Sequence, residues 1–135
     1  MLKFLLDTNI AIYAIKNRHP SISTRFEQNA GQMGMSSIVV AELLFGAEKS
    51  QNPARSLAVV EALCSRLTVL EYGTQAAAHY GQIRAQLEKL GTPIGVNDMH
   101  IAGHARSEGL TLVSNNLREF ERVPGLLMAN WLADT

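Results

Sequence analysis

The sequence has no excess of charge of either sign. Twelve lysines and arginines balance twelve aspartates and glutamates, so the formal net charge at pH 7 is zero. Proteins that hold nucleic acid over a broad surface normally carry a clear positive charge. Any basic binding surface of this chain is therefore expected to be local or to arise by oligomerisation.

Cysteine and long apolar runs are also scarce. Cys64 is the one cysteine in the chain, which excludes an intramolecular disulfide framework and suits a reducing compartment. No window approaches the roughly 18 uninterrupted apolar residues of a membrane-spanning helix. Residues 1–15 carry Lys3 and Asp7 and do not resemble a signal peptide. The sequence therefore predicts a cytoplasmic protein with no membrane partner.

Several catalytic signatures are missing. The chain has neither of the glycine-rich phosphate loops, GxGxxG and GxxxxGK[ST], and it has no GxSxG nucleophile turn. What remains is ordinary for a globular protein, with 47% hydrophobic and 18% charged residues in a chain of 135. We expect one compact domain over residues 1–135.

Short apolar runs alternate with longer helical segments along the chain. The runs KFLL, GQMGMSS, TVLEY, TLVS and LLMANW read as strands, and the segments between them as helices. Asp7 or Thr8 is expected to cap the first helix, and Asn52-Pro53 is expected to begin the fourth. Thr74 is expected to cap the long helix, which ends at Gly91. This alternation predicts an α/β fold with a central, mostly parallel sheet of four or five strands.

Acidic residues fall where such a fold gathers ligands, beyond the carboxyl ends of the strands. Asp7 follows the first strand, and Asp98 begins a helix, so each is either a helix cap or a ligand. Glu42 lies in IVVAELLF, a run apolar on every side, where an unpaired carboxylate would be costly. Glu119 follows the strand TLVS. We expect these carboxylates to share one site.

An oxygen-only site of this kind suits Mg²⁺ or Mn²⁺ and fits a cation-dependent phosphodiesterase. The competing zinc site would use His100 and His104, which lie four residues apart in HIAGH, but it lacks the glutamate of HExxH, and packing or surface roles are favoured. Arg84 and Arg118 are candidates for holding an RNA phosphate backbone, with an exposed, solvated position as the alternative.

The chain contains, in this order, the motifs DTN at Asp7, SSIVVAELLFGAEKS around Glu42, PIGVND at Asp98 and LVSNNLREFERVPGL. The order and spacing of these motifs resemble those of the PIN-domain toxins of VapBC toxin–antitoxin modules. The resemblance covers essentially the whole chain. It implies a PIN-like α/β/α sandwich and an endoribonuclease that uses Mg²⁺ or Mn²⁺ to cut RNA and inhibit translation. The substrate it implies is initiator transfer RNA, cut in the anticodon stem-loop.

The resemblance also assigns residues and partners. Asp7, Glu42 and Asp98 would be the metal-binding acids, and Thr8, Asn9 and Ser114 would orient them. A cognate VapB-type antitoxin would neutralise the toxin by placing an extended segment in or beside the acidic site, and operator DNA would be bound only through that antitoxin. A homodimer and higher toxin–antitoxin assemblies are likewise implied.

One position departs from the family pattern. Asn116 stands where many PIN domains have an aspartate, which removes one charge from the site although its carbonyl oxygen can still serve as a ligand. Glu119 either compensates for it catalytically or forms an ion pair with Arg118 or Arg122. Asn116 therefore also keeps open a different class of function, a weakly active PIN-fold binding module that acts mainly through its antitoxin complex.

Overall fold

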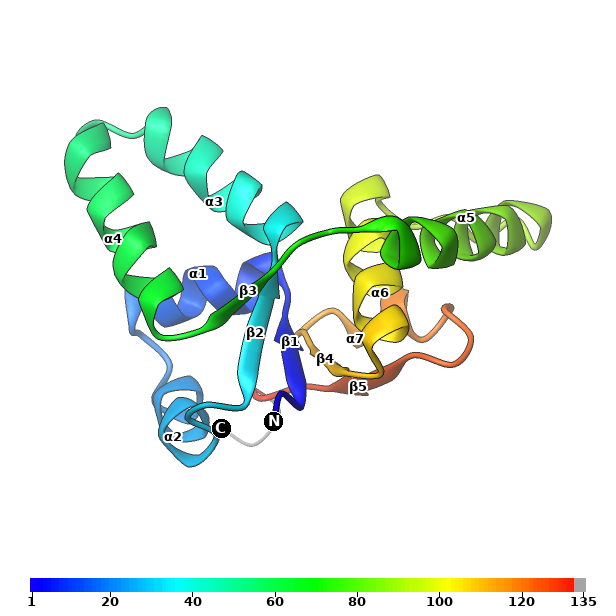
Figure 1. Cartoon of the computed structure of the whole chain (residues 1–135), viewed down its shortest axis with the longest axis horizontal. Helices are drawn as coiled ribbons and strands as arrows, with labels where there is room; N and C mark the ends of the chain where they lie inside the picture. Colours follow the sequence, from blue (N-terminus) through cyan, green and yellow to red (C-terminus); the bar gives the residue numbers. More distant parts are fainter. Residues whose placement is uncertain (133–135) are drawn as a thin grey trace.

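A computed structural model describes residues 1–132 and arranges its strands in one sheet (Figure 1). The order across the sheet is β3-β2-β1-β4-β5, and all four neighbouring pairs are parallel. The strands are β1 Phe4–Leu6, β2 Met33–Ser36, β3 Thr68–Leu70, β4 Thr111–Val113 and β5 Leu127–Ala129. All five predicted strands are therefore confirmed, and the sheet is parallel throughout the described chain.

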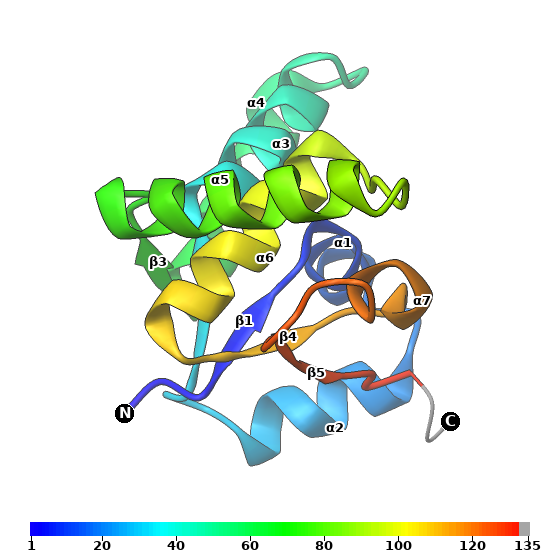
Figure 2. The same ribbon diagram turned by 90° about the vertical axis from the view of Figure 1, so that its right-hand side faces the viewer.

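Helices cover both faces of this sheet. They are α1 Thr8–Lys16, α2 Pro20–Gln28, α3 Ser37–Glu48, α4 Pro53–Ser65, α5 Thr74–Lys89, α6 Val96–Glu108 and α7 Leu117–Phe120. Helices α5 and α6 lie on one side, and α1 and α4 lie on the other (Figures 1 and 2). The predicted α/β/α sandwich is confirmed. None of the helices within residues 1–132 is both long enough and apolar enough to cross a membrane.

The helix boundaries follow local chemistry, with one exception to the sequence prediction. Helix α4 begins at Pro53 after Asn52, whose side chain accepts a hydrogen bond from the Arg55 backbone N–H at 3.3 Å. The prediction that Thr74 caps α5 is wrong. Gly73 has the extended backbone of the capping position, so Thr74 is already the first helical residue.

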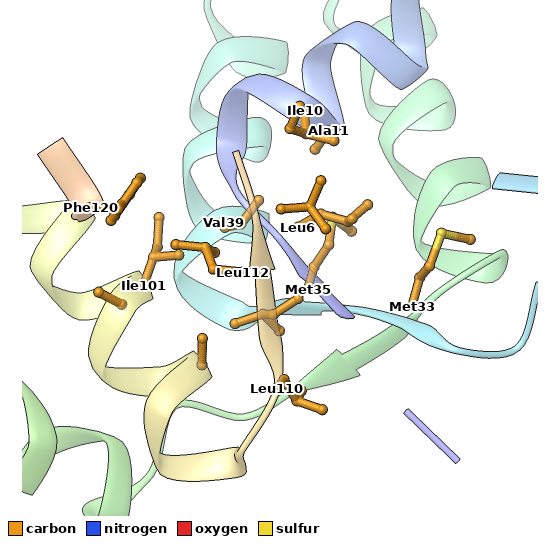
Figure 3. Close-up of a cluster of buried hydrophobic side chains, with 14 of the residues drawn as sticks. Leu6, Ile10, Ala11, Met33, Met35, Val39, Ile101, Leu110, Leu112 and Phe120 are labelled. Atoms are coloured by element: carbon orange, nitrogen blue, oxygen red, sulfur yellow. The ribbon is translucent and has the colours of Figure 1, made fainter. Parts of the chain in front are cut away.

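The core lies between the central strands and the helices on either side of them. Leu5, Leu6 and Leu112 of β1 and β4 are fully buried, as expected for strands covered on both faces. Figure 3 shows side chains from both helical layers converging on these strands, among them Ile10 of α1 and Ile101 of α6. This packing holds the carboxyl ends of β1 and β4 in a rigid frame.

The chain reverses direction across the sheet between β1 and β4. From β1 it builds outward through β2 to β3, and then crosses back through α5 and α6 to β4 on the other side of β1. Open parallel sheets bind ligands beyond the carboxyl ends of the strands at such a switch point. Asp7 follows β1 and Ser114 follows β4, so both residues lie at the predicted place.

Candidate active site

Asp7 is held in place by both strands at the switch point and by its own helix. Its backbone N–H donates to Val113 O of β4 at 3.0 Å, and its side-chain Oδ1 accepts from Ile10 N at 2.9 Å, which caps α1. The side chain of Ser114 also hydrogen bonds to the Asp7 carboxylate. Of the two predicted caps, Asp7 and Thr8, the structure therefore uses Asp7, because one of its carboxylate oxygens forms the capping bond.

Burial dominates the electrostatics of Asp7. Only 4% of the residue is exposed. Loss of hydration raises the pKa of the Asp7 carboxyl above its ordinary value, the hydrogen bonds from Ser114 and Ile10 oppose this, and the negative charge of Glu42 adds to it. Asp7 is thus an anchored acid whose charge the protein alone only partly compensates.

Asp98 lies in the first turn of α6, beside Gly95. A Cβ atom at Gly95 would approach Asp98 Oδ2 to 3.2 Å, so glycine at this position leaves the carboxylate accessible. The pKa of Asp98 is raised to about 6, first by burial and then by the charge and hydrogen bond of Glu119, with smaller contributions from Asp7 and Glu42. Burial and the neighbouring Glu119 therefore both favour the protonated form of Asp98 when no cation is present.

Glu42 projects from α3, and its environment differs from the one expected. The sequence suggested a helix surrounded by other parts of the protein, but Leu44 and Phe45 are 40% and 65% exposed. Glu42 itself is half-buried, and its Oε1 atom is shielded from solvent without a hydrogen-bond partner within residues 1–132. A shielded, unpartnered carboxylate oxygen is expected to have a binding function.

These three acids line one pocket of about 390 Å³ at the carboxyl edge of the sheet. They come from three separate parts of the chain, at the start of α1, in the second turn of α3 and in the first turn of α6. The pocket is lined by Asp7, Thr8, Asn9, Ile12, Glu42, Gly95, Asn97 and Asp98. The fold has therefore gathered the acids that were predicted to act together.

The acids surround the pocket without closing on one point. Among residues 1–132, no three carboxylate, imidazole or thiol side chains are close enough to hold the same ion. Mg²⁺ normally retains several waters and takes only one or two carboxylates from a protein. The donor set fits such an ion, because Glu42 has a shielded oxygen without a hydrogen-bond partner within residues 1–132, and the negative charges of Asp7 and Glu42 raise the pKa of Asp98.

The other predicted site residues take different positions. Ser114 is fully buried behind Asp7 and also accepts the Asn116 backbone N–H at 2.9 Å. Asn116 begins α7 without a side-chain capping bond and does not line the pocket. Glu119 reaches the site only through Asp98. Thr8 Oγ1 is buried and has no hydrogen-bond partner in the described part of the chain.

The two candidate phosphate-binding arginines differ in their surroundings. Arg84 donates to Glu88 at 2.9 Å and to the Tyr80 hydroxyl at 2.6 Å, all on α5, a helix that contributes no residue to the acidic pocket. Arg118 is exposed on α7, next to Glu119 in the chain, and no hydrogen bond or ion pair within residues 1–132 engages its side chain. Arg118 is therefore the one of the two that is near the acids and free to bind.

The histidine alternative is not supported by the geometry. His100 Nδ1 lies 2.6 Å from the Tyr72 hydroxyl, and its ring stacks on Tyr80 at 3.9 Å between centroids. His104 is buried, with neither ring nitrogen hydrogen bonded within residues 1–132. Loss of hydration lowers the pKa of both histidines, which keeps the rings neutral. Both histidines lie on α6, where their rings contact Tyr72, and they form no metal cluster in the described chain.

Sequence reasoning missed three residues of the pocket, Ile12, Gly95 and Asn97. Gly95 and Asn97 belong to the segment GVND, in which the sequence pattern singles out Asp98 alone. A glycine directly before a helix with an acid in its first turn indicates that a ligand can come close to that acid. This signal could have been recognised in the sequence. Ile12 has no such signal, because its position follows only from how α1 lies against α3.

Comparison with known proteins agrees with this geometry. The family model of the PIN domain matches residues 4–126, most of the chain. The chain belongs to the PIN-domain family. Among PIN domains it falls with the VapC ribonucleases, since it is 62% identical to Ribonuclease VapC2 of Haemophilus influenzae over 98% of this chain and 100% of that one. It is also 58% identical to the tRNA(fMet)-specific endonuclease VapC of Salmonella typhimurium, over 97% and 99% of the two chains.

Solved structures of VapC proteins share the fold closely. The DNA-bound VapBC structure from Salmonella typhimurium has a chain that matches with a TM-score of 0.94 and 58% identity, over 97% of this chain and 99% of that one. The VapBC2 structure from Rickettsia felis, bound to a fragment of promoter DNA, matches with a TM-score of 0.91 and 38% identity, over 96% and 99%. The predicted resemblance to VapC toxins and the predicted fold are both confirmed.

Proposed function

We propose that this VapC-family protein is an endoribonuclease toxin that hydrolyses RNA at the pocket of Asp7, Glu42 and Asp98, with Mg²⁺ or Mn²⁺ as cofactor. The observation that carries the proposal is the convergence of these three acids on one pocket at the switch point of the sheet. We propose further that residues 1–135 act as a single domain and that the toxin acts in the cytoplasm, where transfer RNA is found.

The three acids would hold the cation, and each has a distinct means of positioning. Asp7 is immobilised by Ile10, Ser114 and its backbone bond to β4. Asp98 is fixed at the start of a helix that packs on the sheet, and Glu42 offers a shielded, unpartnered oxygen. A bound divalent cation would supply the positive charge that phosphodiester hydrolysis requires at the scissile phosphate.

Glu119 would act on this site through Asp98. Its charge and hydrogen bonding beside Asp98 raise the pKa of the Asp98 carboxyl, so Glu119 would favour the protonated form of Asp98 until a cation is bound. Asn116 and Ser114 would support this arrangement from behind, since Ser114 joins Asp7 to the backbone of Asn116.

Transfer RNA, and initiator transfer RNA in particular, is the substrate we propose. Support comes from relatives at 58% and 56% identity, from Salmonella typhimurium and Shigella flexneri, which are named tRNA(fMet)-specific endonucleases. We place the cut in the anticodon stem-loop, where an unpaired strand can enter a pocket of this size. Cleavage there would inhibit translation by removing the initiator.

A VapB-type antitoxin is the protein partner we propose. The solved relatives are VapBC complexes, two of them with DNA. An extended antitoxin segment with a basic side chain would complement the acids of the pocket and block it. We propose that operator DNA is bound through the antitoxin alone, consistent with a toxin of zero net charge, and that toxin homodimers build the larger assembly.

The proposal is tested with purified protein, initiator transfer RNA, and an elongator transfer RNA as competitor. We expect cleavage of the initiator in Mg²⁺ or Mn²⁺, none in EDTA, and a fall of at least ~100-fold for Asp98→Asn, because loss of a ligand removes several kcal/mol of stabilisation. Glu108→Gln, which removes an exposed acid from the other end of the same helix, is the matched control.

A wild-type protein that left both transfer RNAs intact in either metal would overturn the ribonuclease proposal. If calorimetric titration also detected no Mg²⁺ or Mn²⁺ binding, the chain would be better described as a PIN-fold binding module.

A further inference from the structure

A second pocket, of about 500 Å³, adjoins the acidic one. Ile12 and Glu42 line both pockets, so the two lie side by side with these side chains between them. The first pocket carries the acids, whereas the second is lined mainly by aliphatic side chains together with Lys16 and Arg55. The site described above therefore has an extension of different chemical character.

Two helices run from one pocket to the other. Along α1, Asp7 and Thr8 line the acidic pocket, Ile12 lies at the junction, and Lys16 lines the second pocket. Four residues of helix advance by about 6 Å, so Lys16 lies roughly one turn beyond the junction. Along α3, Glu42 lies at the junction and Gly46, one turn further on, lines the second pocket. The extension thus has a defined direction away from the acids.

The two cations of the extension are available to a ligand. Lys16 and Arg55 are exposed, and neither side chain forms an ion pair or hydrogen bond within residues 1–132. They come from the last turn of α1 and the first turn of α4, so two separate helices direct positive charge toward the same pocket. By contrast, the cation Arg84 on α5 is already paired with Glu88.

We propose that this second pocket receives one unpaired nucleotide of the RNA next to the scissile bond. Its base would lie against the aliphatic wall, and its phosphate would be held by Lys16 and Arg55. The inference rests on the proposed ribonuclease function. The charge pattern supports it, because the scissile phosphate needs a cation held by acids, whereas the neighbouring phosphate needs a fixed positive charge. A pocket of this volume with few polar groups is of a size that holds a small planar ligand.

The first test removes the cations one at a time. Steady-state cleavage of a fluorescent anticodon stem-loop from initiator transfer RNA is measured over a range of KCl concentrations. We expect Lys16→Gln and Arg55→Gln each to raise KM about fivefold to tenfold while kcat stays within about twofold. The slope of log kcat/KM against log salt should become shallower by about 0.7 for each phosphate that the protein no longer neutralises. Lys89→Gln, at the exposed end of α5, is the matched control and should change neither value.

The second test fills the pocket without changing its charge. Gly46 lines the second pocket, and a Cβ atom there would meet nothing within 4 Å. Gly81 of α5 has the same open surroundings but lies outside both pockets. Leucine favours helix more than glycine does, so neither substitution should prevent folding. We expect Gly46→Leu to raise KM about tenfold and Gly81→Leu to leave it unchanged.

The outcomes separate the two proposals. If wild-type protein does not cleave the RNA, the proposed function fails and this inference fails with it. If it cleaves the RNA but Lys16→Gln, Arg55→Gln and Gly46→Leu leave KM and the salt slope unchanged, only the nucleotide pocket is overturned. It is also overturned if those variants keep their RNA kinetics and instead lose a co-expressed VapB-type antitoxin, because the pocket then belongs to the protein partner.

Discussion

At the scale of single residues, Asp7 combines two functions that the sequence presented as alternatives. Its Oδ1 atom caps α1 through Ile10 N, and the same carboxylate faces the acidic pocket. A carboxylate has two oxygens and about four acceptor positions, so one capping bond leaves room for a cation. The capping bond also fixes the orientation of the group, which makes the helix cap part of the active site.

Substitution of Asp7 separates its two functions. Asparagine caps a helix about as well as aspartate does, so Asp7→Asn should retain the free energy of unfolding of the wild type, whereas Asp7→Ala should lose about 1 kcal/mol. Both variants should lose RNA cleavage by ~100-fold or more, because neither supplies the negative charge. Urea denaturation and cleavage assays on the same preparations check this. Full activity in Asp7→Asn would show that Asp7 is only a cap.

At the scale of secondary-structure elements, the position of Asp98 depends on how α5 and α6 pack. Gly103 of α6 lies so close to α5 that an added Cβ atom would come within 2.9 Å of the Tyr80 backbone nitrogen. The Tyr72 hydroxyl hydrogen bonds to His100 of α6, and the ring of Tyr80 stacks on the ring of the same histidine. These contacts set the direction of α6 and therefore the place where its first turn delivers Asp98.

A methyl group at Gly103 should force the two helices apart. We expect Gly103→Ala to lower the free energy of unfolding by about 1–3 kcal/mol, the usual cost of overpacking a close contact. Gly81→Ala, also in a helix but with open space around it, should instead stabilise the protein by up to about 1 kcal/mol. Chemical denaturation of both variants measures the difference. Equal stabilities would contradict the close packing of α5 and α6.

At the scale of the whole molecule, the fold gathers like charges that would otherwise stay apart. Asp7, Glu42, Asp98 and Glu119 lie far apart in the sequence, yet the negative charge of Glu42 raises the pKa of Asp7, and the charges of Glu119, Asp7 and Glu42 raise the pKa of Asp98. Without a cation, this accumulation of negative charge opposes folding. The protein therefore gives up some stability to build the pocket, and a bound divalent cation should restore it.

The pH dependence of stability in EDTA reports this cost. The pKa of Asp98 rises from 3.8 to about 6 on folding, so the folded protein keeps a proton that the unfolded chain releases. The contribution of Asp98 to stability should therefore fall as pH rises from about 4 to about 6, and Asp98→Asn should remove this dependence. Mg²⁺ at ten times its Kd should add about 1.4 kcal/mol at neutral pH. Thermal denaturation follows both effects, and identical pH profiles for the two proteins would contradict the expectation.

The local elements were predictable from local patterns. Apolar runs such as that of β1 are buried on both faces, and Asn52-Pro53 begins α4 as its chemistry requires. The prediction for Thr74 relied on its side chain, which is of a type that caps helices well. It is wrong because the residue with the extended backbone of the capping position is Gly73, one residue earlier. The apolar run around Glu42 predicts a burial that α3 lacks, and the importance of this residue comes instead from a single shielded oxygen.

Residue type and short-range periodicity are enough to specify the strands, the helices and the candidate acids. The resemblance to the family comes from the order and spacing of the sequence motifs, so all of these follow from the amino-acid sequence alone. The tertiary structure was needed to establish that Asp7 is both cap and pocket wall, that Glu119 reaches the site through Asp98, and that Asn116 lies outside the pocket. Those relations depend on the packing of segments far apart in the chain. The same is true of the second pocket, since α1, α3 and α4 bring Lys16 and Arg55 to the end of a groove that no local pattern contains.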